Sequence, residues 1–389
     1  MRRPLYQFFS LEEYRQRLDA LRSRMEKRGI DVLLVTTPEN LYYLSGYQTP
    51  GYYWYQTLIV LPDREPVFIT RLNESSNIEP LSWVEDSRPY GDEEDWIART
   101  KETLEDLGVA GKRIGIEKKS WFITIDDAER LTAAMPSAVI VDGSNLVEEG
   151  RVIKSPQEVT YIRQAARAAE AGILAGIEAS EVGATENDVA AEVHRAQIRA
   201  GSEYTGLPVF VQAGPRATMC HATWYRRRLE PNEMVHMEIP GCVHRYHAAK
   251  WAQVYLGNPP DYMLEAFDHV VAINKLIRDT MRPGVRAGDI WEQVRRTVED
   301  AGLGTERGQR MAYSIGIAYA PDWGEGYILS VMEGEERELQ PGMVFHVTGA
   351  HGLTLHEGGS ARCTDTVLIT EDGCEALTDG LERKLFVKN

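Results

Sequence analysis

The sequence lacks the cysteine spacings that mark a zinc knuckle or a disulfide framework. Its cysteines are scattered without a CxxC pair, at Cys220, Cys242, Cys363 and Cys374. It also lacks any apolar run near the roughly 18 residues that span a bilayer. The N-terminal stretch MRRPLYQFFSLEEY has no long apolar core of the kind found in signal peptides. We therefore expect a reduced, cytoplasmic protein that does not bind membranes.

Positive charge is in short supply. The chain carries 43 Lys and Arg against 59 Asp and Glu, for a formal net charge of −16. This balance argues against nucleic acid or an anionic membrane surface as the main partner. It suits an enzyme that binds a cation, and surface solubility explains it equally well.

Flexible Gly/Ser linkers and low-complexity segments are also absent, although 389 residues are too many for one ordinary core. Over residues 1–150, short apolar runs such as IDVLLVTT and RIGIE alternate with helical patterns, which predicts an α/β N-terminal domain. Residues 151–389 read as two helices, strands, two helices and strands. This repeat predicts an internally duplicated α+β domain, with two pairs of helices packed on a curved antiparallel sheet.

The segment HMEIPGCVHRYHAAKWAQ, residues 236–253, reads as two strands joined by a turn. Because side chains alternate on a strand, His236 and Glu238 share one face. On the returning strand, His247 shares a face with Trp251, and Tyr246 lies on the other face. Glu238 interrupts an otherwise apolar strand, where a carboxylate is costly unless it is paired. It is therefore either a functional group or half of an ion pair.

Three further clusters contain residues that could take part in chemistry. His221 follows a loop in GPRATMCHATW, where a lone histidine is usually only a surface residue. The loop APDWGEG could present Glu325 to a site, with Trp323 beside it, or its Asp322 could simply cap a turn. His346 in PGMVFHVTG lies in an apolar strand, where a hydrogen-bonded core histidine is the ordinary interpretation.

An aromatic loop, GYQTPGYYWYQ over residues 46–56, carries four tyrosines and a tryptophan. Aromatic faces hold cations or small rings through cation–π contacts. Tyr and Trp are also enriched at subunit interfaces, so the loop could equally lie at one.

The order of these segments resembles the pita-bread metallopeptidase superfamily, which includes methionine aminopeptidase, prolidase and aminopeptidase P. The full chain looks like its creatinase/prolidase branch, which has an extra N-terminal domain. Members with metals use five ligands to hold two metal ions. The corresponding positions in this sequence are Glu238, Ala249, Tyr313, Thr348 and Thr364. Only one potential ligand of the usual kind remains, so we expect no metal and no other cofactor.

Other segments are similar to the metal-free hydrolases of the superfamily, ectoine hydrolase and creatinase. EIPGCVHRYH, AYSIGIAYAPDWGE and PGMVFH match segments of ectoine hydrolases, and His221 stands where these enzymes have their catalytic base. The late CTD, the strand WAQVYLG and the aromatic loop depart from the ectoine hydrolase pattern. These departures put the identity of the substrate in doubt.

The resemblance implies a metal-independent hydrolase that cleaves a C–N bond in a small cationic or zwitterionic amidine or guanidine. His221 would be the general acid/base, Glu238 would orient the cation or attack it covalently, and Glu325 would be a second carboxylate for the substrate nitrogens. The resemblance implies that the pocket is lined by Tyr246, His247, Tyr313, Trp323 and His346. An N-terminal domain would add Tyr52, Trp54 and Arg71. In a homodimer, this would be the N-terminal domain of the partner subunit. Arg71 would pair with a substrate carboxylate.

Two alternatives of other classes stay open. A metal-dependent Xaa-Pro peptidase would contain bound metal, and the missing ligands count against it. A non-catalytic ligand-binding protein would be stabilised by a ligand without turning it over. Retention of His221, Glu238 and the PDWGE segment counts against that second alternative.

Overall fold

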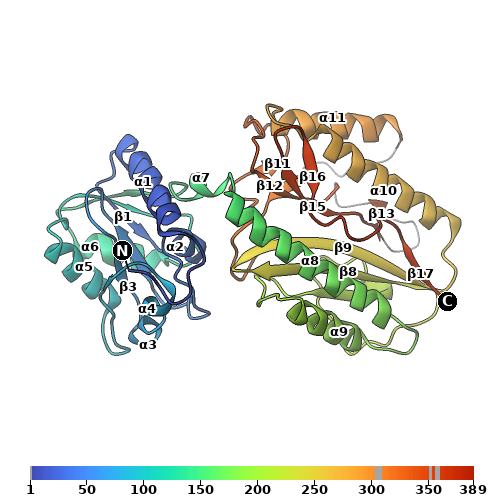
Figure 1. Ribbon diagram of the computed structural model, residues 1–389, viewed down its shortest axis with the longest axis horizontal. Coiled ribbons are helices and arrows are strands. Elements are labelled where there is room, and N and C mark those ends of the chain that lie inside the picture. Colours follow the sequence, from blue (N-terminus) through green and yellow to red (C-terminus); the bar gives the residue numbers. More distant parts are fainter. Residues whose placement is uncertain (1, 303–308, 350–352, 355–359) are drawn as a thin grey trace. The chain divides into compact units, whose positions relative to one another are not determined.

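The computed structural model describes residues 2–302, 309–349, 353–354 and 360–389, and the chain separates into two compact units (Figure 1). The first unit is Met1–Arg151 and the second is Val152–Asn389. Each unit has its own sheets and its own hydrophobic core, so each is described by itself.

The first unit is built on a six-stranded mixed sheet in the order β4-β3-β2-β1-β5-β6. Central strand β1 runs antiparallel to β2 and parallel to β5. The strands are β1 Val32–Val35, β2 Thr57–Val60, β3 Val67–Ile69, β4 Asp86–Ser87, β5 Arg113–Ile116 and β6 Val139–Asp142. The helices are α1 Leu11–Lys27, α2 Pro38–Ser45, α3 Leu72–Ser75, α4 Ile78–Leu81, α5 Trp96–Asp106, α6 Ile125–Ala134 and α7 Glu148–Arg151. This is the α/β domain that the alternating pattern predicts.

The second unit contains two helix pairs, each followed by strands. The helices are α8 Pro156–Ala179, α9 Glu186–Arg199, α10 Asp261–Thr280 and α11 Ala287–Asp300, with a short 3-10 turn η1 at Gly214–Arg216. The strands are β7 Phe210–Ala213, β8 Glu233–Val243, β9 Tyr246–Leu256, β10 Ala312–Ser314, β11 Ser330–Val331, β12 Val344–Val347, β13 Leu353–Thr354, β14 Ser360–Ala361, β15 Asp365–Ile369, β16 Cys374–Ala376 and β17 Phe386–Lys388. Helix α8 begins at a capping box in which Ser155 and Glu158 each bond the other's backbone N–H.

The strands of this unit pair in a four-stranded sheet, β17-β9-β8-β7, a five-stranded sheet, β11-β10-β12-β15-β16, and the short pair β13-β14. The predicted antiparallel pairing therefore holds for β7, β8 and β9, but β17 runs parallel to β9. Threonine side chains connect the two larger sheets. Thr366 Oγ1 accepts from Ala249 N at 2.9 Å, and Thr364 Oγ1 accepts from Trp251 N at 2.9 Å. These hydroxyls satisfy backbone donors that a neighbouring strand would otherwise satisfy.

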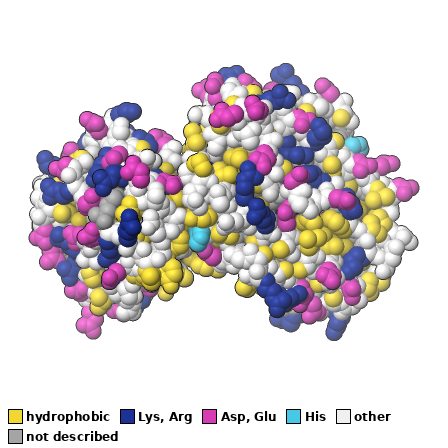
Figure 2. Space-filling model, viewed as in Figure 1, with side chains coloured by type: hydrophobic (Ala, Val, Ile, Leu, Met, Phe, Trp, Pro, Cys, Tyr) yellow, Lys and Arg dark blue, Asp and Glu magenta, His cyan; other side chains and the backbone are white. Residues whose placement is uncertain are grey.

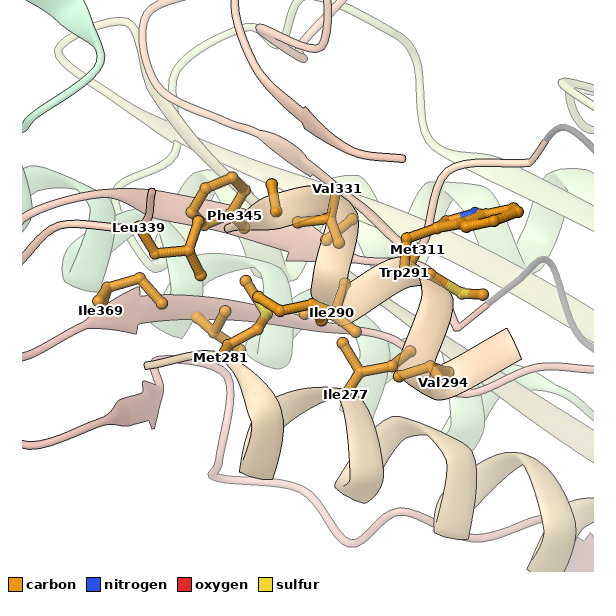
Figure 3. Packing of buried hydrophobic residues seen from close by; sticks show 14 of the residues in the cluster. Ile277, Met281, Ile290, Trp291, Val294, Met311, Val331, Leu339, Phe345 and Ile369 are labelled. Atoms are coloured by element: carbon orange, nitrogen blue, oxygen red, sulfur yellow. The ribbon is translucent and has the colours of Figure 1, made fainter. Parts of the chain in front are cut away.

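Each helix pair covers one of the two larger sheets. Helix α8 packs across β8 and β9 in Figure 1, over a core that includes Ile173 and Met237. Helices α10 and α11 pack on the five-stranded sheet, where Ile277, Ile290 and Phe345 converge in Figure 3. Because side chains alternate on β12, burial of Phe345 against the helices turns the next residue, His346, toward the opposite face.

The surface carries both signs of charge. Figure 2 shows acidic and basic side chains interspersed over the visible face of each unit, with no large basic patch on that face. Among the described residues, no helix is both long and apolar enough to cross a membrane.

Candidate active site

Glu238 lies in the middle of a row of three side chains on one face of the four-stranded sheet. On β8 it pairs in register with Phe210 of β7 and with Trp251 of β9. Side chains directly opposite one another on antiparallel strands point to the same face. The register therefore places the carboxylate between two large aromatic rings.

Glu238 is only 6% exposed, and no salt bridge reaches it from the described part of the chain. Burial raises its pKa to about 7, because a charged carboxylate is poorly solvated there. The indole of Trp251 and the positive charge of Arg362 lower the pKa by less than burial raises it, and Asp322 raises it slightly further. Near neutral pH both its protonated and its ionised forms are present, so it can act as an acid/base or, when ionised, bind a cation.

His221 lies over the same row. Its ring stacks on Phe210 with the centroids 5.5 Å apart and the planes 23° from parallel. The residue is exposed, and its φ of 53° is in the left-handed region that non-glycine residues seldom occupy. Backbone strain of this kind is concentrated at functional sites. Phe210 is thus a neighbour of both residues, through ring stacking with His221 and through the strand register with Glu238.

A series of ring contacts also connects the two ends of this row, Phe210 and Trp251. Trp323 contacts Phe210 at 5.8 Å and donates its indole N–H to the Tyr313 hydroxyl at 3.0 Å. The ring of Tyr313 lies 5.4 Å from His346, whose ring lies 6.3 Å from Trp251. We call the five rings the aromatic circuit: Phe210, Trp323, Tyr313, His346 and Trp251. Burial raises the pKa of Tyr313, so its hydroxyl stays protonated.

The five positions that the resemblance assigns to metal ligands all lie in the described part of the chain, and they do not fit a metal pair. Ala249 has no donor atom, and the hydroxyl of Tyr313 accepts from Trp323. Thr348 donates its hydroxyl to the carbonyls of Arg310 and Met311, and the hydroxyl of Thr364 accepts from a backbone N–H. Within the described residues, no three His, Cys, Asp or Glu side chains converge as a metal ion requires. His351, His356 and Glu357 lie outside those residues.

Comparison with known proteins identifies the family. A model of metallopeptidase family M24 matches residues 160–371, and a model of the creatinase/prolidase N-terminal domain matches residues 17–153. The chain belongs to family M24.

The relatives of this M24 chain are hydrolases. It is 31% identical to an ectoine hydrolase of Halomonas elongata, over 98% of each chain. It is 32% identical to an uncharacterised hydrolase/peptidase of Sinorhizobium fredii, over 98% of this chain and 99% of the relative. The prolidase of Pyrococcus horikoshii superposes with a TM-score of 0.81 at 21% identity, covering 95% of this chain and 100% of the prolidase. The protein is therefore a hydrolase of the M24 family with the pita-bread fold.

Two residues expected to line the site have other contacts in this M24 unit. The side chain of Tyr246 lies on the opposite face of β9, and its hydroxyl donates to Glu158 Oε1 at 2.6 Å. His247 uses both ring nitrogens on the backbone: Nδ1 donates to Arg245 O at 2.9 Å and Nε2 accepts from Gly206 N at 3.0 Å. Burial and the nearby Arg245 lower the pKa of His247 to about 3. We assign both side chains to packing and leave them out of the proposed site.

Glu325 is buried in an ion pair. Its Oε2 lies 2.8 Å from Lys154 Nζ and 3.1 Å from Ser314 Oγ, and both charged side chains are 1% exposed. The expected contact with substrate nitrogens would have to displace Lys154. The ion pair connects the PDWGE loop, which contains Trp323, to the residues just before α8, so we expect Glu325 to stabilise this loop.

The remaining expected residues lie in the first unit. Arg71 makes a bidentate pair with Asp92, at 2.5 and 2.8 Å, and its guanidinium lies 4.3 Å from the centroid of the Trp54 ring. Tyr52 makes an edge contact with Phe122 at 5.4 Å. Trp54 is 36% exposed. A substrate carboxylate would therefore compete with Asp92 for Arg71.

Sequence reasoning missed three site residues: Phe210, Trp251 and His236. The ring of His236 is fully buried and meets Trp251 edge-on at 5.5 Å. The signal for Trp251 and His236 was present, since period-two alternation from Glu238 marks the same face on both strands of the hairpin. Phe210 could not be found this way, because its contact depends on the register between β7 and β8.

Proposed function

We propose that this M24 protein is a metal-independent hydrolase that cleaves a C–N bond in a small cationic or zwitterionic amidine or guanidine. One observation carries the proposal. Glu238 is a buried carboxylate with no salt bridge from the described residues, although the charge of Arg362 acts on it, and it lies opposite the aromatic residues Phe210 and Trp251 on the neighbouring strands. The similarity to an ectoine hydrolase over nearly the whole chain supports the same reaction class.

A planar amidinium or guanidinium suits such a site. Its N–H groups can bond a carboxylate in a bidentate manner, and the flanking ring faces of Phe210 and Trp251 attract positive charge. The cation would replace the interactions that Glu238 lacks in the unliganded protein, and would favour its ionised form. Binding of the substrate and ionisation of Glu238 are therefore coupled.

Hydrolysis then needs an activated water molecule and a proton for the leaving nitrogen. His221 takes a proton from water as the water oxygen adds to the electrophilic carbon. The same imidazolium returns the proton to the leaving nitrogen as the C–N bond breaks. An amidinium carbon is already electron-poor, so it needs less electrophilic assistance than a peptide carbonyl does. Glu238 holds the cation through both steps, or its oxygen bonds to the carbon while the amine leaves with a proton from His221, and water later attacks the Glu238 carboxyl carbon to release the product. Single-turnover hydrolysis in ¹⁸O-water tests the second route, because attack at the carboxyl carbon transfers a protein oxygen to the product.

The remaining assignments complete the proposed pocket. Tyr313, Trp323 and His346 form its walls, and the aromatic loop of the first unit, with Tyr52, Trp54 and Arg71, covers it from a partner subunit in a homodimer. Arg71 exchanges Asp92 for a substrate carboxylate. Mixing two inactive proteins, one altered at Arg71 and one at His221, tests this arrangement: restored turnover supports a shared site, and none counts against it.

The first experiment is a thermal-shift screen of the full-length protein with ectoine, hydroxyectoine, creatine, guanidinoacetate and Xaa-Pro dipeptides. Each ligand that stabilises the protein is then assayed for turnover with and without a chelator, and the protein is analysed for bound metal. We expect an amidine or guanidine to be hydrolysed at a rate that the chelator leaves unchanged. Chelator-sensitive cleavage of a dipeptide would establish the metal-dependent alternative, and stabilisation without turnover would establish a binding protein.

His221→Ala tests the catalytic assignment. General acid/base catalysis contributes roughly 10²- to 10⁴-fold to a rate, so we expect kcat to fall by that factor. Because His221 is an exposed loop residue, the midpoint of thermal unfolding should stay close to that of the wild type. Unchanged turnover of the identified substrate would remove His221 from the mechanism.

A further inference from the structure

A row of polar side chains lies next to the row of Phe210, Glu238 and Trp251, on the same face of the sheet. His236 of β8 pairs in register with Gln212 of β7 and with Gln253 of β9. Residues two apart on a strand point to the same face, with a backbone spacing of roughly 7 Å. The edge contact between His236 and Trp251, at 5.5 Å, joins this row to the aromatic circuit.

The polar atoms of this row are unevenly satisfied. His236 is 0% exposed and Gln212 is 1% exposed. Within the described ranges, the two ring nitrogens of His236 have no hydrogen-bond partner, and the Oε1 atom of Gln212 has none either. Gln253, in contrast, donates to Ser360 O at 2.6 Å and accepts from Arg362 N at 2.8 Å. Buried polar atoms in native proteins are nearly always hydrogen-bonded, so His236 and Gln212 call for a further partner.

We propose that His236 and Gln212 bind a neutral hydrogen-bonding group of the substrate, a hydroxyl or an N–H, beside the cation held by Glu238. This inference rests on the proposed function, and it specifies which amidines or guanidines the site selects. The geometry carries it: both side chains occupy the face of Glu238, in the adjacent row, and both lack partners in the described structure.

The chemistry of the two side chains determines which group fits. Burial, with the positive charge of Arg362, keeps the pKa of His236 well below its usual range, so the imidazole is neutral. A neutral imidazole has one N–H donor and one acceptor, and the Gln212 oxygen is a second acceptor. A hydroxyl can accept from the imidazole and donate to the amide oxygen. A carboxylate can only accept, and a methyl group can do neither.

Such a site should discriminate between ligands that differ by one polar group. When a site is built to hydrogen-bond a hydroxyl or N–H, an analogue without it leaves buried protein groups unpaired. Hydroxyectoine and ectoine form one such pair. Guanidinoacetate and creatine form another, since an N–H of the first is an N-methyl group in the second.

The test measures dissociation constants for both pairs by titration calorimetry, with full-length wild type, His236→Leu and Gln212→Leu. We expect the wild type to prefer the more polar member of at least one pair by roughly three- to tenfold, the effect of one neutral hydrogen bond. Either substitution should bring that ratio close to one while amidine binding itself persists. Gln253→Leu is the matched control from the same row, and should lower thermal stability but keep the ratio.

Each remaining outcome counts against the proposal. Absence of a preference in the wild type, or a preference that survives both substitutions, would mean that water or another part of the chain satisfies His236 and Gln212. If the affinity ratio also falls close to one in Gln253→Leu, the loss reflects a general disturbance of the sheet. If no amidine or guanidine binds the wild type at all, the proposed function fails and this inference fails with it.

Discussion

Glu238 and Glu325 are two buried carboxylates in the same unit, with opposite surroundings. Glu325 has Lys154 at 2.8 Å and Ser314 at 3.1 Å, so its charge is compensated within the fold. Glu238 has aromatic neighbours and a pKa raised to about 7. A protein keeps an uncompensated buried carboxylate only where something outweighs its cost. The contrast predicts that Glu325 stabilises the fold and that Glu238 is available to a ligand.

The largest effect on stability is expected at the compensated carboxylate. Glu325→Gln leaves the Lys154 ammonium buried without a counter-charge, and breaking such a pair from one side costs about 3–5 kcal/mol. Chemical denaturation should show this loss in the free energy of unfolding. The double variant Glu325→Gln with Lys154→Met removes both charges and should recover much of it. A single variant as stable as wild type would show that Glu325 needs no partner, and would return it to the list of candidate substrate ligands.

At Glu238, in contrast to Glu325, we expect removal of the charge to stabilise the fold. Its folded-state pKa of about 7 lies above the ordinary 4.5, so the folded protein binds this proton more tightly than the unfolded chain does. The free energy of unfolding therefore falls as pH rises from about 4.5 to 7, and above pH 7 the full destabilisation by the ionised Glu238 is present. Glu238→Gln carries no charge and should be more stable than wild type at pH 8 by up to about 3 kcal/mol, at 1.36 kcal/mol per pKa unit.

Near pH 4 this difference between wild type and Glu238→Gln should vanish, because both side chains are then neutral. Glu117 of the first unit also has a pKa raised to about 7 by burial, but it is common to both proteins and cancels in the difference. Denaturation curves at several pH values give the measurement. A variant that is less stable than wild type at pH 8 would mean that Glu238 has a structural partner.

The smallest effect is on ligand affinity. A cation binds the ionised form of Glu238, and a group with a pKa of about 7 is mostly protonated at pH 6 and mostly ionised at pH 8. The affinity for an amidine or guanidine should therefore rise by about tenfold from pH 6 to pH 8. Glu238→Gln should bind more weakly and lose this dependence. An affinity that is independent of pH in the wild type would place the cation elsewhere.

Local patterns in the sequence predict much of this fold. The capping box at Ser155 marks the start of α8, and alternation along 236–253 places His236 and Glu238 on one face. Such signals depend on residues within a few positions of each other. Family resemblance adds the five ligand positions, which no local pattern reveals.

The partners of the buried polar groups could not be predicted in this way. Lys154 and Glu325 are 171 positions apart, and Tyr246 and Glu158 are 88 apart. In the sequence, Glu325 and Tyr246 are simply a charged and an aromatic residue within segments that resemble the family, and nothing local identifies their partners. The packing of loops and of helix α8 against the sheets gives Glu325 and Tyr246 their partners, and the register of β7, β8 and β9 places Glu238 opposite two aromatic residues.

The hydrogen bond of Thr364 limits which substitutions this position can accept. The Thr364 hydroxyl accepts the Trp251 backbone N–H at 2.9 Å, at one of the five positions that the resemblance assigns to metal ligands. A mutation to glutamate would add a carboxylate and at the same time remove a hydrogen bond on which β9 now depends. Ala249 and Thr348 would have to change as well before a metal could bind. Building a metal site at these positions would thus require several substitutions, and at least one of them would remove a hydrogen bond that the fold now uses.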